Sequence, residues 1–212
     1  ALNFVKEKVE IEMNAVTDNP VIFIEDGLAI SAGNFHGEPL AMPFDYLGIA
    51  ISEMGNISER RIERMVNPSL SNGLPAFLVE KSGINSGFMI VQYSAASLVS
   101  ENKVLAHPSS VDSIPSSANQ EDHVSMGTIG ARKAGSILDN VRNIVSMELF
   151  TACQAIDLRG KTKLGKKTEK AYNKVREYIP FINSDEIMYK HIHLVNDLVK
   201  SEELFKAIFE EE

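Results

Sequence analysis

Apolar residues recur at steps of three and four along most of the chain, which is the spacing of one face of an α-helix. One such stripe consists of Leu40, Phe44, Leu47, Ile51, Met54 and Ile57. A longer one consists of Ala134, Ile137, Val141, Ile144, Val145, Leu149, Ala152 and Ile156. The pattern predicts helices from residue 38 onward, over about 85–106 and over about 121–158, with shorter helices after residue 167.

The segment before residue 38 follows a different pattern. A first helix is expected to end near Asn14, because residues 17–20 read Thr-Asp-Asn-Pro, a dense turn signal. Residues 21–24 and 28–30 are apolar and flank Glu-Asp-Gly, which indicates a short β-hairpin. The predicted fold class is all-α, a long-helix bundle with one small β-hairpin near the N-terminus, and residues 1–212 are expected to form a single helical domain.

Composition and charge narrow the function classes. A formal net charge of −8 argues against a nucleic-acid partner, which would require clustered Lys and Arg. No apolar run approaches the roughly 20 residues that cross a bilayer, so no membrane partner is expected. Cys153 is the single cysteine, which excludes an internal disulfide and favours the cytoplasm. The chain starts without Met in helical spacing, so we expect a C-terminal piece of a longer protein.

Three motifs that suggest chemistry have simpler explanations. Residues 160–168 nearly spell a P-loop, but Lys167 replaces the required Ser or Thr and a helix precedes it, so a solvated basic linker is expected. His191 and His193 would point to opposite sides of a helix, which predicts surface histidines rather than metal ligands. Cys153 falls within the apolar periodicity and is expected to be a buried thiol. No Gly-x-Ser-x-Gly elbow supports a serine hydrolase.

Two polar segments are candidates for a functional site. Residues 31–39 read Ser-Ala-Gly-Asn-Phe-His-Gly-Glu-Pro, between the predicted hairpin and a long helix. Residues 116–123 read Ser-Ser-Ala-Asn-Gln-Glu-Asp-His, at the predicted start of the longest helix. Amide, carboxylate and imidazole groups there would face the positive end of the helix dipole. Helix capping and a functional site are both open at this point.

Five motifs in order resemble the C-terminal half of the histidine ammonia-lyases, a branch of the aromatic amino acid ammonia-lyases. They are residues 14–20 (Asn-Ala-Val-Thr-Asp-Asn-Pro), 33–39, 58–61 (Ser-Glu-Arg-Arg), 100–103 (Ser-Glu-Asn-Lys) and 116–126. The resemblance marks residues 1–159 as the part that matches the family, and residues 160–212 as C-terminal helices. The family assembles as a homotetramer, which suits the long helices.

The reaction that the resemblance implies is removal of ammonia from L-histidine to give urocanate. Family members use an electrophile, 4-methylidene-imidazol-5-one (MIO), formed by cyclisation of an internal Ala-Ser-Gly. That tripeptide occurs nowhere in this chain, so the cofactor is expected from an N-terminal part outside it and the chain alone is expected to be inactive. The alternatives are a tyrosine or phenylalanine ammonia-lyase fragment, or a non-catalytic helical oligomerisation module.

The resemblance also implies roles for particular residues. Phe35 resembles the aromatic residue beside the electrophile, and Glu121 resembles the carboxylate near the substrate imidazole, either as base or as hydrogen-bond partner. Met89 resembles an apolar residue of the side-chain pocket, with ordinary core packing as the alternative. The neighbouring residues implied in substrate binding are Gln120, Asn119 and His36. No metal ligand is implied.

Overall fold

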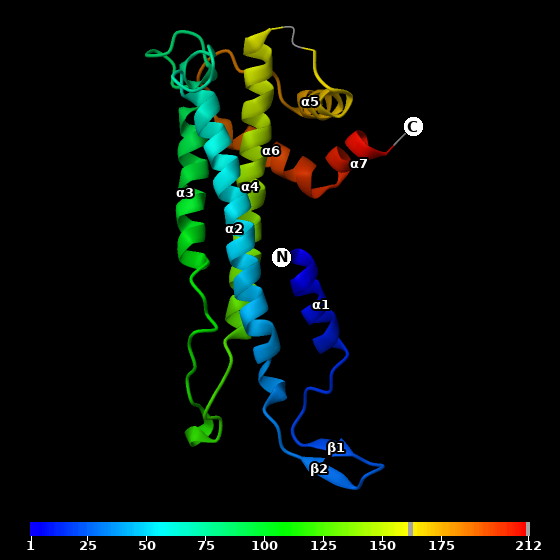
Figure 1. Ribbon diagram of the computed structural model, residues 1–212. Coiled ribbons are helices and arrows are strands. Elements are labelled where there is room, and N and C mark those ends of the chain that lie inside the picture. The colour runs from blue at the N-terminus through cyan, green and yellow to red at the C-terminus, as the bar shows by residue number, and fades with distance from the viewer. Residues whose placement is uncertain (161–162, 211–212) are drawn as a thin grey trace. The chain divides into compact units, whose positions relative to one another are not determined.

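The computed structural model describes residues 1–160 and 163–210, and its elements are labelled in Figure 1. The described residues form seven α-helices and one two-stranded antiparallel hairpin, which confirms the all-α prediction with its small hairpin. The elements are α1 (Leu2–Met13), β1 (Val21–Phe23), β2 (Leu28–Ile30), α2 (Glu38–Val66), α3 (Met89–Leu105), α4 (Gly127–Arg159), α5 (Lys166–Tyr178), α6 (Met188–Lys200) and α7 (Glu203–Phe209). None of the helices in the described ranges is both long and apolar enough to span a bilayer.

The chain divides into two compact units. Unit 1 comprises Ala1–Glu53 and Asn102–Leu138, and unit 2 comprises Met54–Glu101 and Asp139–Glu212. The boundaries between them fall inside α2, α3 and α4. Both segments that the sequence singled out for chemistry belong to unit 1, so that unit is the one that carries the candidate site.

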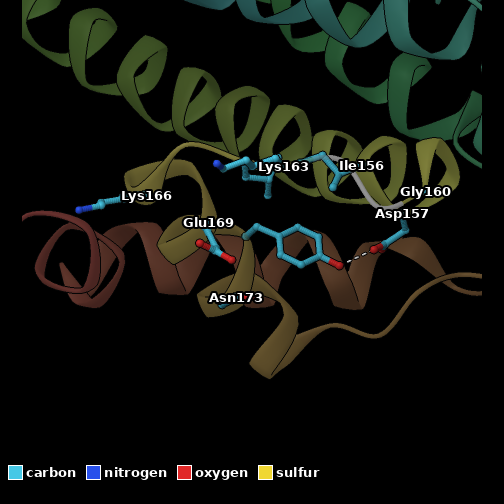
Figure 2. A pocket seen from close by; sticks show the side chains of 9 residues that line it. Ile156, Asp157, Gly160, Lys163, Lys166, Glu169 and Asn173 are labelled. Carbon is cyan, nitrogen blue, oxygen red and sulfur yellow. Dashed lines mark hydrogen bonds between the residues drawn. The ribbon is translucent and has the colours of Figure 1, made fainter.

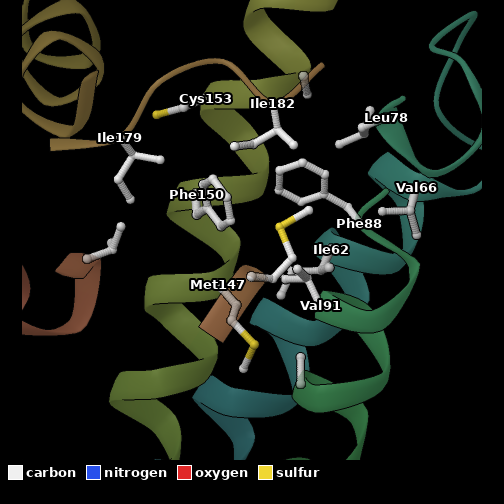
Figure 3. Close-up of a cluster of buried hydrophobic side chains, with 14 of the residues drawn as sticks. Ile62, Val66, Leu78, Phe88, Val91, Met147, Phe150, Cys153, Ile179 and Ile182 are labelled. Atoms are coloured by element: carbon white, nitrogen blue, oxygen red, sulfur yellow. The ribbon is translucent and has the colours of Figure 1, made fainter. Parts of the chain in front are cut away.

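Unit 2 is built around one hydrophobic core. Phe88 and Phe150 lie at its centre with ring centroids 4.7 Å apart, and both are fully buried. Figure 3 shows them with Ile62, Met147 and Ile182, which come from α2, α4 and the loop before α6. The predicted apolar stripe on α4 contributes Ile144 to this core. Met147 and Phe150, which the stripe did not include, extend the buried face at steps of three residues, and Cys153 follows at the same step.

In unit 1, small residues let the beginnings of α2 and α4 approach closely. A Cβ atom on Gly127 would lie 3.3 Å from the carbonyl oxygen of Gly37 and 3.6 Å from Ala41. A Cβ on Gly130 would lie 3.3 Å from the carboxylate of Asp45. The hairpin pairs Val21 with Ile30 and Phe23 with Leu28 and leads into the segment before α2. The close helix approach brings the loops at their N-terminal ends together.

The predicted start of the longest helix at about residue 121 is wrong. The helix α4 begins at Gly127, because Ser117, Ala118 and Asn119 all have positive φ angles of 53°, 56° and 69° and cannot continue a right-handed helix. α3 also begins later than predicted, at Met89 rather than near residue 85. In both places a structured loop occupies the residues assigned to the first turn.

The remaining motif predictions have mixed outcomes. Cys153 is a buried free thiol, as expected. His193 is exposed, but the His191 side chain is only 17% exposed and lies against Phe150 with a ring-centroid distance of 5.6 Å, so the prediction of a surface residue is wrong there. Helix packing against the core explains the difference. Within the basic segment 160–168, residues 161 and 162 lie outside the described ranges, and α5 begins at Lys166.

Candidate active site

Two segments far apart in sequence line one cavity in unit 1. The cavity has a volume of about 480 Å³. Residues from 31–38 form one part of its wall and residues from 120–125 form another. Its lining residues are Asn19, Ser31, Ala32, Gly33, Phe35, His36, Glu38, Gln120, Glu121, Asp122, His123 and Ser125. Four of the six residues singled out from the sequence are therefore together, namely Phe35, His36, Gln120 and Glu121.

A single turn of 3-10 helix, Asn34–His36, presents Phe35 and His36 to the cavity. Gly37 ends this turn with a φ of 75°, a left-handed conformation that glycine adopts without strain. The Asn34 side-chain amide donates a hydrogen bond of 2.6 Å to the carbonyl oxygen of Val16. This bond ties the turn to the chain segment before the hairpin and so fixes the position of the two rings.

The second wall is a tight loop closed on itself. The backbone N–H of Ser116 donates to the carbonyl of Glu121 at 3.0 Å, and the N–H of Glu121 donates back at 3.3 Å. The left-handed residues 117–119 form the turn between them. Consecutive positive φ angles in non-glycine residues are costly and concentrate at functional sites. Glu121 therefore does not sit in the first turn of α4, and the helix dipole does not explain its position.

His36 and Glu121 form a direct hydrogen-bonded pair. The His36 Nε2 atom lies 2.8 Å from Oε2 of Glu121, and the two side chains are 17% and 29% exposed. The His36 ring also packs against Phe35, with centroids 4.1 Å apart and planes inclined by 35°. A carboxylate, an imidazole and a partly exposed phenyl ring thus stand side by side, a set that can bind an aromatic or heteroaromatic ligand and exchange a proton with it.

Two predicted site residues do not line this cavity. Asn119 is exposed and belongs to the left-handed turn, where an asparagine tolerates a φ of 69° better than most residues. Met89 is half-buried at the first residue of α3 and belongs to unit 2. Their implied roles in substrate binding stay predictions.

The sequence reasoning did not assign a role to Ser125. Its hydroxyl donates a hydrogen bond to the backbone carbonyl of His36, 89 residues away, and so joins the two walls of the cavity. Glu38 and Asn19 line the cavity as well. Asn19 accepts a hydrogen bond of 3.2 Å from the N–H of Ala32. Nothing in local periodicity signals these contacts, since each depends on a partner in a separate segment.

A second cavity, of about 630 Å³, lies in unit 2 between the end of α4 and α5. Figure 2 shows Asp157, whose carboxylate accepts a hydrogen bond from the hydroxyl of Tyr172. The same carboxylate pairs with Arg176. None of the site residues predicted from the sequence lines this cavity. The Asp157 carboxylate is engaged in joining α4 to α5, which is a structural role.

Comparison with known proteins assigns the family. The family described as aromatic amino acid lyase matches residues 1–177. The chain is 64% identical over 208 residues to histidine ammonia-lyase 1 of Fusobacterium nucleatum, covering 98% of this chain and 40% of that protein. It is 59% identical to the histidine ammonia-lyase of Alkaliphilus oremlandii, over 98% of this chain and 41% of that protein.

Solved structures agree. The crystal structure of histidine ammonia-lyase from Trypanosoma cruzi is similar with a TM-score of 0.90 and 48% identity, over 97% of this chain and 40% of that one. Tyrosine aminomutase from Streptomyces globisporus is similar with a TM-score of 0.92 and 39% identity, over 98% of this chain and 39% of that one. The chain spans about 40% of the length of these relatives. On this match in sequence and fold, the chain belongs to the aromatic amino acid lyase family.

Proposed function

We propose that this chain is the C-terminal part of a histidine ammonia-lyase, which removes ammonia from L-histidine and releases urocanate. The observation that carries the proposal is the meeting of Phe35 and Glu121 at one cavity. The identity of 64% to the Fusobacterium nucleatum relative supports histidine as the substrate. The two units together are proposed to act as one domain of a longer cytoplasmic lyase.

Glu121 supplies the acid–base chemistry in this proposal. A carboxylate accepts an N–H from an imidazole, and a suitably placed one removes a proton from carbon when it lies within about 3 Å of it. An imidazole ligand gains more from such a partner than a plain phenyl ring does, because only the imidazole has an N–H to donate. Gln120 lines the same cavity and offers an amide to the substrate. Asn119 and Met89 are the other binding residues that the family resemblance implies.

The reaction also needs an electrophile, because an amine leaves poorly. MIO, which the family resemblance implies, accepts electron density from the departing amine when it is bound. Phe35 lines the cavity and is 39% exposed, so we assign it to pack against this flat heterocycle. The Ala-Ser-Gly precursor is absent from this chain, so a part of the protein outside it must provide the group. We propose a homotetramer as the complete assembly.

A substrate panel tests the proposal. The full-length protein that contains this chain is incubated separately with L-histidine, L-tyrosine and L-phenylalanine, and the absorbance of urocanate, coumarate or cinnamate is followed. We expect urocanate as the main product. Coumarate or cinnamate instead would assign the chain to the tyrosine or phenylalanine branch, which the likeness to tyrosine aminomutase makes the second candidate. If none of the three substrates gives a product, the proposal of catalysis is contradicted and a helical oligomerisation module is favoured.

A further inference from the structure

We infer that His36 is a positioning residue that holds the carboxylate of Glu121 in its working orientation. The inference rests on the proposed function and assigns His36 a role through Glu121 in place of direct contact with substrate. The first observation is the hydrogen bond of 2.8 Å between Nε2 of His36 and Oε2 of Glu121. This bond engages Oε2, one of the two carboxylate oxygens, and we assign the other to the ligand.

Three contacts hold the His36 imidazole, whose Nε2–H is the donor, in place. The ring is held against Phe35 at a centroid distance of 4.1 Å, and the backbone carbonyl accepts a hydrogen bond from Ser125. The third contact is the pair with Glu121 itself. A side chain of 17% exposure with its Nε2 already engaged has little freedom to turn toward a ligand. The neutral ring with its proton on Nε2 and the protonated ring both donate to the carboxylate, so the contact survives either form.

Among the residues that the structure describes, the Glu121 side chain is bonded to His36, and its own loop holds only its backbone. The bridge between Ser116 and Glu121 holds only backbone atoms. A glutamate side chain has three rotatable bonds, and a productive proton transfer requires its carboxylate to be placed within a fraction of an ångström. The hydrogen bond to His36 supplies the side-chain restraint that the loop lacks.

Three variants of the full-length enzyme test the role in solution. His36→Phe keeps a flat ring against Phe35 without the donor, and we expect kcat for histidine to fall about tenfold to a hundredfold while KM changes less than about threefold. His36→Gln restores an N–H donor and is expected to recover most of the lost kcat. His193→Phe, at an exposed histidine of α6, is the matched control. A fall in kcat with no recovery in His36→Gln would contradict positioning by hydrogen bonding.

A double-mutant cycle separates action through Glu121 from direct binding. In a Glu121→Ala background, His36→Phe should cause no further loss of kcat, because its partner is already gone. Losses that multiply would show that His36 acts on the substrate directly and would overturn the inference.

Crystal structures of the wild-type enzyme and of His36→Phe provide a readout that does not depend on activity. We expect Glu121 in a single rotamer in the wild type and in a shifted or divided one in the variant. An unmoved Glu121 would overturn the inference even if the enzyme makes urocanate. Failure of the substrate panel would instead overturn the proposed function, so the two outcomes are distinguishable.

Discussion

The buried carboxylate of Asp45 on α2 accepts a hydrogen bond of 2.7 Å from the backbone N–H of Ser110, 65 residues further along the chain. Asp45 is 7% exposed, and Lys133 on α4 provides a nearby positive charge while donating to the carbonyl of His107. The carboxylate thus anchors the connector between α3 and α4 within unit 1. That connector leads directly into the loop that carries Glu121.

Replacing this anchor is expected to destabilise unit 1. In Asp45→Ala the N–H of Ser110 loses its acceptor, and we expect the free energy of unfolding to fall by about 1–3 kcal/mol. Denaturant titration measures the difference. Asp139→Ala, at an exposed carboxylate on α4, is the control and should change it by less than about 0.5 kcal/mol.

The same carboxylate predicts a pH dependence. Burial raises the pKa of Asp45, but hydrogen bonds from the backbone of Ser109 and Ser110 and the charge of Lys133 outweigh it, and the net pKa lies below its usual value. A depressed pKa means that the stabilisation is present above the unfolded-state value and disappears as the pH falls through the folded-state value. The stability difference between wild type and Asp45→Asn should therefore shrink below about pH 4. A stability difference between the two proteins that stays constant as the pH falls below about 4 would contradict a depressed pKa of Asp45.

Gln154 is expected to be essential for stability in unit 2. Its fully buried amide donates to the carbonyls of Leu78 and Ile182, at 3.1 and 2.8 Å, and accepts from the N–H of Ile182 at 3.1 Å. Gln154→Leu keeps the side-chain volume but leaves these buried backbone groups without hydrogen-bond partners, which should lower the free energy of unfolding by about 3 kcal/mol. Thermal unfolding measures the loss. A variant as stable as Asn173→Leu, at an exposed position, would refute the role of the amide bonds.

The left-handed turn before Glu121 predicts an unusual response to substitution. Ala118 has a φ of 56°, so Ala118→Gly should stabilise the protein by about 0.5 kcal/mol or leave it unchanged. Asn119→Val places a β-branched side chain at a φ of 69° and should destabilise it by about 1–2 kcal/mol. Differential scanning calorimetry compares the two. The reverse order of stabilities would show that the turn is not left-handed.

The Cys153 thiol should react slowly in the folded protein. It is 2% exposed, and burial raises its pKa to about 11, so the nucleophilic thiolate is scarce at pH 8. We expect iodoacetamide to label it at that pH only after denaturant is added, as measured by mass spectrometry. Rapid labelling without denaturant would contradict the burial.

Glu121→Gln in the full-length enzyme tests the proposed acid–base role. The amide keeps the size of the side chain but cannot take a proton, so kcat for histidine should fall by about 10²- to 10⁴-fold. Size-exclusion chromatography should show an unchanged oligomer. Activity close to that of the wild type would remove Glu121 from the mechanism.

The helices were predictable because their apolar residues repeat along the chain, as in the stripe on α4 that contains the buried residues Ile137 and Ile144. The start of α4 was not. Positive φ angles are usually signalled by glycine, but the three residues that have them here are Ser117, Ala118 and Asn119. The bridge that closes their loop joins backbone atoms of Ser116 and Glu121, which leave no mark in the sequence. The sequence pattern of these residues therefore does not predict their backbone conformation, because contacts with the surrounding structure determine it.

The candidate site also was predictable from the sequence only in part. Motif resemblance identified Phe35, His36, Gln120 and Glu121, which do line one cavity. The resemblance did not reveal that His36 is hydrogen-bonded to Glu121. The two residues are 85 positions apart, and each side chain is able to bond to many other groups. The contact of Ser125 with the carbonyl of His36 was missed for the same reason.

The hydrogen bond between His36 and Glu121 closes a long stretch of polypeptide, and the glycines that let α2 and α4 approach make that closure possible. No short synthetic peptide cut from either segment would reproduce the pair, since the entropy lost in joining ends so distant is recovered only by packing of the whole unit. A Cβ atom added at Gly127 would lie 3.3 Å from the carbonyl oxygen of Gly37, so Gly127→Ala should shift the starts of α2 and α4 slightly and weaken the pairing of His36 with Glu121.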